Sequence, residues 1–238
     1  MRIAALYDIH GNLPALEAVL ADVANEGVDE LVVGGDVLWG PLQVECVDLL
    51  RAVDAVFVRG NCERDVLQPE HEHDTARWCA AQLDDRTRTF VAEWPLTVER
   101  EIEGLGTVLL CHATPRNDEE IITAITPDDV VRDALSGVQA EVVVCGHTHV
   151  QFDRSSPGLP RLVNAGSVGL PYEGVQGARW VLLGDGIELR HTAYDVEHAF
   201  ERMEPAGFPS FTDVFSGSLR GTTTSDEATA QFESRRGA

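Results

Sequence analysis

Residues 2–25 read RIAALYDIHGNLPALEAVLADVAN, and this stretch decides the fold. Residues 2–7 form a short apolar run of the kind found in strands, and from Leu13 onward apolar side chains recur at helical spacing. Pro14 stands near the start of that helix, where its missing N–H has no intrahelical partner to lose. The stretch therefore predicts a strand over Arg2–Tyr7 and a helix over Leu13–Asn25, with a polar loop between them.

The alternation of strand and helix continues through the first half of the chain. The next predicted elements are a strand over Glu30–Gly34, a helix over Gln43–Ala52, a strand over Ala55–Arg59 and a helix over Asp74–Glu93. Short strands that alternate with helices are typical of a mainly parallel sheet whose faces are covered by the helices. The first half therefore predicts an α/β fold.

After residue 95 the pattern changes to strands. The predicted strands are Leu96–Ile102, Thr107–Cys111, Glu141–Cys145, Val150–Arg154, Arg161–Asn164, Ala178–Leu183 and Ile187–Ala193, with one helix near Pro127–Leu135. The first two flank Glu103-Gly104-Leu105-Gly106 and predict a hairpin. We expect these strands to build a second sheet, so that two packed sheets carry helices outside.

The domain boundary is expected near residue 215. Residues 1–215 have the pattern of a single domain, and residues 216–238 are rich in Ser, Thr, Gly and charge with few large apolar groups. Such a composition predicts an extended or mobile C-terminal tail.

The charge balance limits the classes of partner. The formal net charge is -22, and every cationic side chain is Arg because the sequence contains no Lys. Such acidity repels nucleic-acid backbones and anionic lipid, which favours a small molecule over a long nucleic acid or a membrane. The apolar stretch Ile3–Tyr7 is too short for a signal peptide or an anchor, so we expect a cytoplasmic protein.

Five of the predicted strands end in residue types that bind metals. The segments that follow them are Tyr7-Asp8-Ile9-His10-Gly11-Asn12, Gly34-Gly35-Asp36, Gly60-Asn61-Cys62-Glu63, Cys111-His112-Ala113 and Gly146-His147-Thr148-His149. In open α/β sheets, ligands bind beyond the carboxyl ends of the strands. We therefore expect these five loops to converge on one site.

Two of these loops carry ligand-type residues at alternate positions. Alternate residues of an extended segment point the same way, so Asp8 and His10 are predicted to bind one cation together. The same geometry applies to His147 and His149, although a turn could direct the two imidazoles to different metals. Asp36 has two carboxylate oxygens and can bridge two cations.

Each ligand-type residue also has an ordinary structural interpretation. A strand-end Asp is more often a turn or cap residue, and a single His is more often a hydrogen-bonded core residue. The combination favours a metal site. A structural zinc site would use paired thiolates at short spacing, which the sequence lacks, whereas mixed Asp, Asn and His side chains suit Mn, Fe or Zn in a catalytic site with open positions.

The ordered set Asp-x-His, Gly-Asp, Gly-Asn-x-Glu, His and Gly-His-x-His over residues 8–149 resembles the calcineurin-like metallophosphoesterase superfamily, in particular its small bacterial phosphodiesterase-like members. The resemblance implies a four-layer αββα sandwich in which two mixed β-sheets are flanked by helices. It implies one metal bound by Asp8, His10, Asp36 and His149. It implies a second metal bound by Asp36, Asn61, His112 and His147, with Asp36 as the bridge.

The implied cofactors are two divalent cations, with Mn preferred and Fe, Zn, Ni or Mg as alternatives. Two cations about 3.5–4 Å apart lower the pKa of a shared water and neutralise charge on the phosphoryl oxygens. The expected function is therefore hydrolysis of a phosphodiester or phosphomonoester of a small molecule by attack of metal-bound hydroxide. The predicted catalytic residues are Asp36, Asn61, Cys62 and His112.

Cys62 departs from the family pattern. Many relatives have His directly after the Asn of the third motif, where it helps to protonate the leaving group. Cys is a poorer donor near neutral pH, and its pKa responds to nearby metal charge. A catalytic thiol and a side chain that merely fills the position are both open interpretations. If the thiol is a weak donor, the site is expected to prefer esters with good leaving groups, and the Cys slightly favours a diester.

Asn12 and Arg116 are the predicted substrate contacts. Asn12 follows the first ligand motif, although it could instead cap the following helix. Arg116 lies just beyond His112, and a guanidinium matches phosphate geometry, although a surface Arg on a loop is an equally good interpretation. The glycine-rich residues 164–169 are predicted to support the ligands. Substrate choice is assigned to the loops Gln68–Thr75 and Thr114–Thr126.

Other classes of function stay open at this level. The nearest enzymatic alternative is a protein or nucleotide phosphatase. The non-enzymatic alternatives are a metal-binding interaction scaffold of the same fold and a protein that binds a phosphorylated ligand without hydrolysing it. Because every ligand position carries a competent residue, the sequence favours the enzyme. The expected partner is a small phosphorylated substrate, and a homo-oligomer is neither predicted nor excluded.

Overall fold

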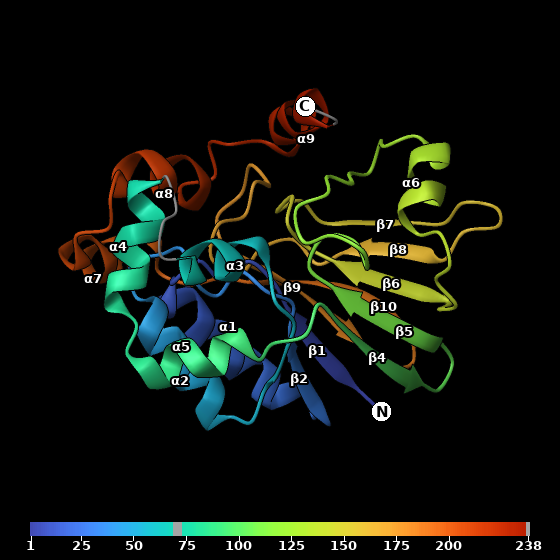
Figure 1. Cartoon of the computed structure of the whole chain (residues 1–238), viewed down its shortest axis with the longest axis horizontal. Coiled ribbons are helices and arrows are strands. Elements are labelled where there is room, and N and C mark those ends of the chain that lie inside the picture. The colour runs from blue at the N-terminus through green and yellow to red at the C-terminus, as the bar shows by residue number, and fades with distance from the viewer. Residues whose placement is uncertain (69–72, 237–238) are drawn as a thin grey trace.

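The computed structural model describes residues 1–68 and 73–236. Two five-stranded sheets pack face to face, and helices lie outside them (Figure 1). The strand order is β10-β9-β1-β2-β3 in the first sheet and β4-β5-β6-β8-β7 in the second. The predicted sandwich of two mixed sheets flanked by helices is confirmed.

The first sheet combines strands from both ends of the chain. Its strands are β1 (Ile3–Leu6), β2 (Glu30–Val33), β3 (Val56–Phe57), β9 (Ala178–Leu183) and β10 (Ile187–Thr192). β1, β2 and β3 are parallel, whereas β9 runs antiparallel to both β1 and β10. The prediction that every strand of the second half joins the second sheet is therefore wrong for β9 and β10. Every residue of β9 is buried, which is consistent with its position between β10 and β1 in the first sheet.

The second sheet repeats this plan. Its strands are β4 (Thr97–Ile102), β5 (Gly106–Cys111), β6 (Val142–Cys145), β7 (Phe152–Arg154) and β8 (Arg161–Asn164). β5, β6 and β8 are parallel, β4 forms the predicted hairpin with β5, and β7 is antiparallel to β8. Each sheet thus has three parallel strands whose carboxyl ends face the same edge.

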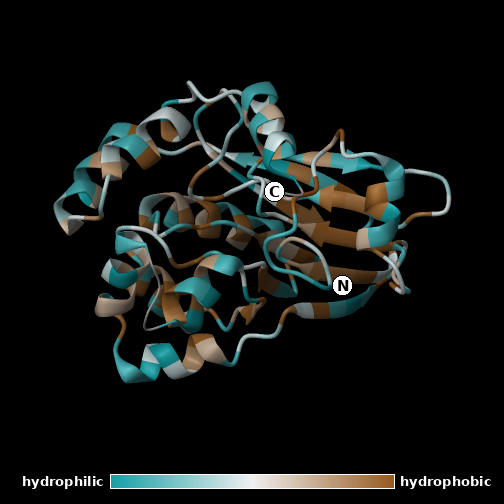
Figure 2. Ribbon diagram, turned by 45° about the horizontal axis from the view of Figure 1, so that its top comes forward, coloured by the Kyte–Doolittle hydropathy of each residue, from teal (hydrophilic) through white to brown (hydrophobic). Residues whose placement is uncertain are grey.

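Alternation along the strands produces three apolar layers. Ala5 of β1 and Val144 of β6 pack in the layer between the sheets, whereas Leu6 packs against the helices of the first sheet. Val143 of β6 points the other way, into the layer beneath α6. Figure 2 shows the apolar residues concentrated along the strands. The Tyr7 hydroxyl donates a hydrogen bond of 3.0 Å to the carbonyl of Val144 and so joins the two sheets.

The helices and their bounds follow the sequence prediction in part. They are α1 (Leu13–Glu26), α2 (Gln43–Ala52), α3 (Asn61–Leu67), α4 (Asp74–Gln82), α5 (Asp85–Ala92), α6 (Asp128–Ala134), α7 (Val196–Met203), the 3-10 turn η1 (Glu204–Ala206), α8 (Phe211–Leu219) and α9 (Ser225–Arg235). The single helix predicted over Asp74–Glu93 is two helices, because Asp84 caps α5 by accepting from the Thr87 N–H at 2.7 Å. Within the described residues, none of these helices has the length and apolarity needed to cross a membrane.

The C-terminal segment differs from the predicted extended tail. Its described part is largely helical, in α8 and α9. Phe215 and Leu219, four residues apart on α8, are buried in the core beside the first sheet. Thr224 and Glu227 form a capping box that begins α9. A few apolar residues at helical spacing and one helix cap are therefore sufficient to form helices in this segment, although its composition is polar. Residues 237–238 lie outside the described residues.

Candidate metal centre

The ligand-type residues all lie at the carboxyl ends of parallel strands. Those after β1 are Asp8 and His10, those after β2 and β3 are Asp36 and Asn61, and those after β5 and β6 are His112, His147 and His149. Three of these strands belong to the first sheet and two to the second. The sandwich therefore brings both sheets together at one edge, which is where open α/β sheets bind ligands.

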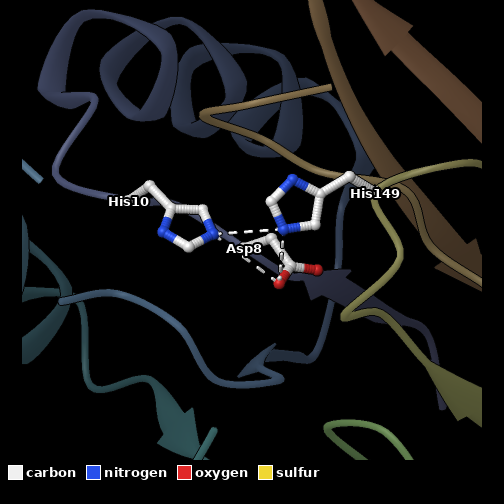
Figure 3. A group of neighbouring side chains, drawn as sticks. All are labelled: Asp8, His10 and His149. Atoms are coloured by element: carbon white, nitrogen blue, oxygen red, sulfur yellow. Dashed lines mark hydrogen bonds and ion pairs between the residues drawn. The ribbon is translucent and has the colours of Figure 1, made fainter. Parts of the chain in front are cut away.

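One group of side chains comprises Asp8, His10 and His149 (Figure 3). The Nε2 atom of His149 lies 3.2 Å from Asp8 Oδ1 and 3.2 Å from the Nε2 atom of His10. His10 Nε2 also lies 3.9 Å from Asp8 Oδ1 and 3.8 Å from Asp36 Oδ2. All four side chains are buried. Their polar atoms therefore converge on one small volume.

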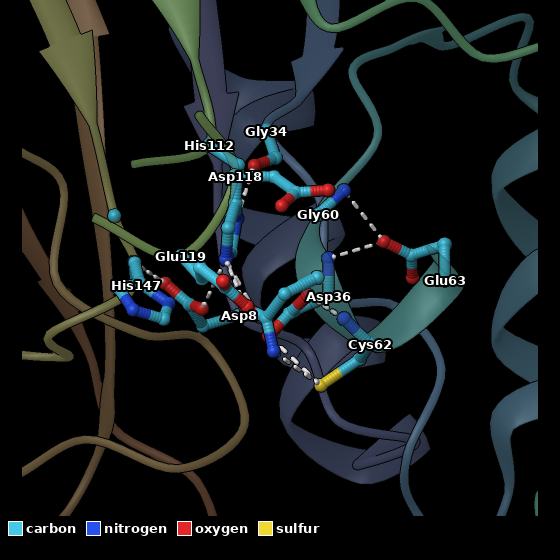
Figure 4. A network of polar contacts seen from close by, with 12 residues as sticks. Asp8, Gly34, Asp36, Gly60, Cys62, Glu63, His112, Asp118, Glu119 and His147 are labelled. Carbon is cyan, nitrogen blue, oxygen red and sulfur yellow. Dashed lines mark hydrogen bonds and ion pairs between the residues drawn. The ribbon is translucent and has the colours of Figure 1, made fainter. Parts of the chain in front are cut away.

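A second group lies beside the first and shares Asp36. The Nε2 atom of His112 is 3.5 Å from Asp36 Oδ2 and 3.1 Å from Asn61 Oδ1. The ring of His147 packs edge-on against that of His112, with centroids 5.2 Å apart. Figure 4 shows Asp36 at the centre of this network, with His112 and His147 on one side and Cys62 on the other. The structure thus brings together all seven residues predicted as metal ligands.

Backbone carbonyls fix the orientation of two imidazoles. His112 Nδ1 donates to the carbonyl of Gly34 at 2.9 Å, and His149 Nδ1 donates to the carbonyl of Leu170 at 2.7 Å. In a neutral ring this leaves Nε2 without a proton, so that a lone pair points into the site. Such anchoring of the distal nitrogen is typical of metal-binding histidines.

With both imidazoles neutral, hydrogen-bond acceptors of the site face one another without a donor between them. A neutral His149 turns the lone pair of Nε2 toward Asp8 Oδ1, which is fully buried and has no hydrogen-bond donor among the described residues. A neutral His112 likewise turns Nε2 toward the carbonyl oxygen of Asn61. Buried acceptors without donors are costly, and a cation between them removes the cost. The residues present therefore fit divalent metals bound through Asp, Asn and His.

The pKa values of four residues in the cluster are shifted toward the form that binds metals. Burial raises the pKa of Asp8, but His149, His112 and His10 together lower it well below its ordinary value. At Asp36, burial also raises the pKa, but the neighbouring imidazoles outweigh it, and the pKa is lowered. Burial and then the nearby imidazole charge lower the pKa of His10 and of His147 to about 4. Ionised carboxylates and neutral imidazoles are the forms that coordinate metals.

The other two histidines respond to the carboxylates. Burial lowers the pKa of His112 and of His149, but the charges of Asp36 and Asp8 outweigh it and raise both values above normal. Two carboxylates buried this close together thus require positive charge nearby. Without a metal, the imidazoles supply it in part.

The ligand loops adopt an uncommon backbone conformation. The φ angles of Asp8, His10, Asp36, His147 and His149 lie between 48° and 65°, in the left-handed region that non-glycine residues rarely adopt. The prediction that Asp8 and His10 lie on an extended segment is therefore wrong in its geometry. For His147 and His149, the alternative of a turn is the one that the backbone angles support. The chain turns at each of these five ligands, and neighbouring loops hold it there, as in the hydrogen bond of 2.9 Å from His10 N–H to the Asp36 carbonyl.

Two glycines let the backbone approach the ligand carboxylates. A Cβ atom added at Gly60 would lie 2.1 Å from Asp36 Oδ1, and one added at Gly146 would lie 2.4 Å from Asp8 Oδ2. Both distances are far below van der Waals contact. Gly60 and Gly146 are therefore required to leave room for the two carboxylates.

Glu63 connects two of the ligand loops. Its carboxylate accepts from the N–H groups of Asp36 and Gly60 at 2.8 Å each (Figure 4). It also accepts from the N–H groups of Val37 at 2.8 Å and Leu38 at 3.0 Å. Burial, followed by the charge of Asp36, raises the pKa of Glu63 to about 7. The sequence motif contains Glu63 but assigns it no role, because its partners are backbone groups from a distant loop.

Cys62 contacts the central carboxylate. Its N–H donates to Asp36 Oδ1 at 2.9 Å and its thiol donates to Asp36 Oδ2 at 3.0 Å. Burial and then the charge of Asp36 raise the pKa of the thiol well above its ordinary value. Cys62 also borders the cavity at the site. Its catalytic role stays a prediction, and the geometry shows a thiol within hydrogen-bond distance of Asp36.

The two predicted substrate contacts differ in position. Asn12 is fully buried: its side chain caps α1 by accepting from the Ala15 N–H at 3.2 Å and donates to the Gly169 carbonyl at 2.9 Å. The alternative interpretation as a helix cap is thus the one that the structure supports, and Asn12 is not available to a substrate. Arg116 is half exposed and pairs with Glu120 and Asp133, each at less than 3 Å.

The predicted supporting segment, residues 164–169, and part of the predicted specificity loops lie close to the ligands. The Ser167 hydroxyl donates to the Asp8 carbonyl at 2.6 Å, so residues 164–169 do support a ligand loop. Within Thr114–Thr126, Thr123 and Thr126 contact α9, and other residues border a cavity beside the site. Residues 69–72 of the loop Gln68–Thr75 lie outside the described residues.

A cavity of about 450 Å³ opens onto the ligands. Its lining includes His10, Asp36, Tyr172 and Arg235. The Tyr172 ring stacks on His149, with centroids 4.9 Å apart and an interplanar angle of 14°. The sequence analysis did not identify Tyr172 or Arg235, because Tyr172 follows no motif and Arg235 stands in the segment predicted as a tail.

Comparisons with known proteins find similarity over most of the chain. A family model described as the calcineurin-like phosphoesterase superfamily domain matches residues 1–184. An uncharacterized protein of Methanocaldococcus jannaschii is 29% identical over 234 residues, which cover 88% of this chain and 94% of that protein. The structure is similar to that of a metallophosphoesterase from Sphaerobacter thermophilus, with a TM-score of 0.73 and 24% identity over 94% of this chain and 99% of that chain. It is also similar to a hypothetical protein from Pyrococcus horikoshii, with a TM-score of 0.75 and 18% identity over 92% and 98%.

Proposed function

Because this chain belongs to the calcineurin-like phosphoesterase superfamily, we propose that it is a dinuclear metal-dependent enzyme that hydrolyses a phosphodiester or phosphomonoester of a small molecule. The observation that carries the proposal is the convergence of six ligand-type side chains around a seventh, Asp36, with hydrogen-bond acceptors facing one another. Such an arrangement is unfavourable by itself and favourable around cations.

The ligands divide between two cations. Asp8, His10 and His149 would hold one, and Asn61, His112 and His147 would hold the other. The contacts of Asp36 Oδ2 with both His10 and His112 support its role as the shared ligand. Mn is the preferred metal, with Fe, Zn, Ni and Mg as alternatives, because hard oxygen and imidazole ligands are mixed here and no thiolate pair is present among the ligands.

When bound, the two metals supply a water of lowered pKa and positive charge for the phosphoryl oxygens. The residues of the chain position everything else. Gly34 and Leu170 hold the imidazoles of His112 and His149 with Nε2 toward the cavity. Asn61 and His147 are half-buried, on the open side of the cluster, where an ester enters. Cys62 holds Asp36 and is the candidate proton donor to a leaving group.

The site favours a small substrate. The cavity of about 450 Å³ has room for a phosphate ester with a compact substituent, and cavities of this size are typical of small-molecule sites. The net charge of -22 disfavours a long polyanion. A protein phosphatase is the weaker candidate because it needs an open groove, and a nucleotide is the more compatible of the alternative substrates.

A non-catalytic scaffold of the same fold is the rival from another class. A scaffold has no need of ligands in strained backbone conformations, whereas five of the seven ligands here have positive φ. Strain of this kind is retained where function requires it. The intact ligand set therefore favours the enzyme.

The test is hydrolysis of bis-p-nitrophenyl phosphate and p-nitrophenyl phosphate by metal-stripped protein, before and after addition of Mn. Asp36→Asn is the variant, and Asp185→Asn, in the exposed turn between β9 and β10, is the matched control. We expect turnover that requires Mn, is lost in Asp36→Asn and is unchanged in Asp185→Asn. Two bound Mn ions without turnover on either ester would support the scaffold or the non-hydrolysing binding protein instead.

A further inference from the structure

The C-terminal helix α9 lies at the metal cavity although it is outside the residues that the family model matches. Phe232 of α9 packs near His147 and Tyr172, with ring centroids 6.2 Å and 6.5 Å apart. Figure 1 shows that the segment after α8 carries α9 away from the helices of the first sheet and toward the second sheet. The end of the chain thus forms part of the cavity wall.

Side-chain contacts hold α9 in this place. Glu233 accepts hydrogen bonds from the hydroxyls of Thr123 at 2.6 Å and Thr126 at 2.5 Å. The other carboxylate oxygen of Glu233 pairs with Arg236 at 2.8 Å. Ala228 is buried beneath the helix. The contacts at residue 233 fix the turn of α9 that carries Arg235.

Arg235 differs from the other cations nearby. It borders both the metal cavity of about 450 Å³ and an adjoining cavity of about 780 Å³, which also share His147. Arg116 and Arg236 border the adjoining cavity as well, but carboxylates already neutralise both. Arg235 forms no ion pair with any described residue. It therefore presents an uncompensated guanidinium at the entrance to the metal centre.

We propose that Arg235 is a substrate-binding residue that holds the non-bridging phosphoryl oxygens of the ester and favours dianionic monoesters over monoanionic diesters. The proposal rests on the proposed function and names the substrate class of that site. A guanidinium donates two parallel hydrogen bonds to a phosphoryl group. Its Coulomb attraction grows with the charge of the ester, so a phosphomonoester gains more than a diester. The 40 acidic residues of the chain repel an anionic ester, and an unpaired cation beside the cavity counters this repulsion locally.

This assignment replaces the role that the sequence gave to Arg116. Both residues border the adjoining cavity, but Arg116 is held by Glu120 and Asp133 on the outer side. Only Arg235 also borders the cavity that contains His10, Asp36 and His149. The substrate contact therefore comes from the last helix rather than from the loop after β5.

The test compares Arg235→Ala and Arg235→Lys with Arg161→Ala, a control that removes an exposed guanidinium that is paired with Asp153 and borders neither cavity. Calorimetry with Mn-loaded protein measures the affinity for inorganic phosphate, and steady-state kinetics gives kcat/KM for p-nitrophenyl phosphate and bis-p-nitrophenyl phosphate. We expect Arg235→Ala to weaken phosphate binding about tenfold and to lower the monoester-to-diester ratio of kcat/KM about fivefold. Lys is expected to restore part of both, Arg161→Ala to change each less than twofold, and the Mn content to stay the same.

Several outcomes would overturn the proposal. Equal losses on the two esters, or a loss of bound Mn, would show that Arg235 only supports the fold. Phosphate affinity that is unchanged in Arg235→Ala, or absent in the unaltered protein, would exclude phosphoryl binding by this residue. If the unaltered protein hydrolyses neither ester, the proposed function fails, but the calorimetry with phosphate still decides the role of Arg235.

Discussion

The ligand cluster at the strand ends and the helix α9 above it border the same cavity but are built in opposite ways. The cluster is buried, its loops hydrogen-bond to one another through the backbone, and five of its residues are held at positive φ. α9 is largely exposed and is held by a few side chains, chiefly Glu233 and Phe232. The proposed metal ligands thus lie on the buried, densely hydrogen-bonded part, and the proposed determinant of specificity lies on an exposed helix, where substitutions cost little stability.

The largest effect is expected when the packing of the ligand cluster is disturbed without removal of a ligand. Gly60→Ala places a Cβ atom 2.1 Å from Asp36 Oδ1 at a φ of -96°, which any residue tolerates, so the effect is steric alone. We expect Mn binding to weaken and turnover to fall about 100-fold, or about 3 kcal/mol in activation free energy. Gly186→Ala is the control, because a Cβ there meets no atom within 4 Å. Normal Mn content in Gly60→Ala would show that the cluster is less rigid than described.

The second effect is on stability. Glu63→Gln places an amide NH₂ against backbone N–H groups from two loops, which leaves buried donors without an acceptor. We expect the free energy of unfolding of the metal-free protein, measured with urea, to fall by about 2 kcal/mol. Glu103→Gln in the exposed hairpin turn is the control and should change it by less than about 0.5 kcal/mol. An equal, small effect of both changes would contradict the role given to Glu63.

A smaller effect is expected at Cys62. Ser retains a donor to Asp36, whereas Ala removes it, so Cys62→Ser should keep turnover within about twofold and Cys62→Ala should lower it about fivefold. The measurement is kcat on esters whose leaving groups differ in pKa. If Cys62→Ser loses as much as Cys62→Ala, and most on poor leaving groups, the thiol itself takes part in catalysis.

The smallest effect is expected on α9. Glu233→Ala removes the acceptor of Thr123 and Thr126, so amide hydrogen exchange in α9 should become faster while exchange in β1 and β6 stays the same. The global free energy of unfolding should change by at most about 1 kcal/mol. Glu197→Ala, which removes an exposed partner of Arg220, is the control. Faster exchange at the ligand loops would mean that α9 and the cluster form one cooperative unit.

The sequence predicts the ligand cluster better than the position of α9, because the cluster follows from local sequence features and α9 does not. Apolar strands that end in Asp8, Asp36 and His112 are local features, and the rule that parallel strands end at one edge brings them together. The positive φ of His149 has no local signal, since glycine is the residue that normally marks it. The positions of β9 and Arg235 depend on pairings between residues far apart in the chain.

The central claim is a two-metal centre with Asp36 as the shared ligand, and anomalous scattering from crystals soaked in Mn tests it most directly. The account predicts two peaks about 3.5–4 Å apart, one in contact with Asp8, His10 and His149, the other in contact with Asn61, His112 and His147, and both in contact with Asp36. A single peak, or two peaks without Asp36 between them, would contradict it.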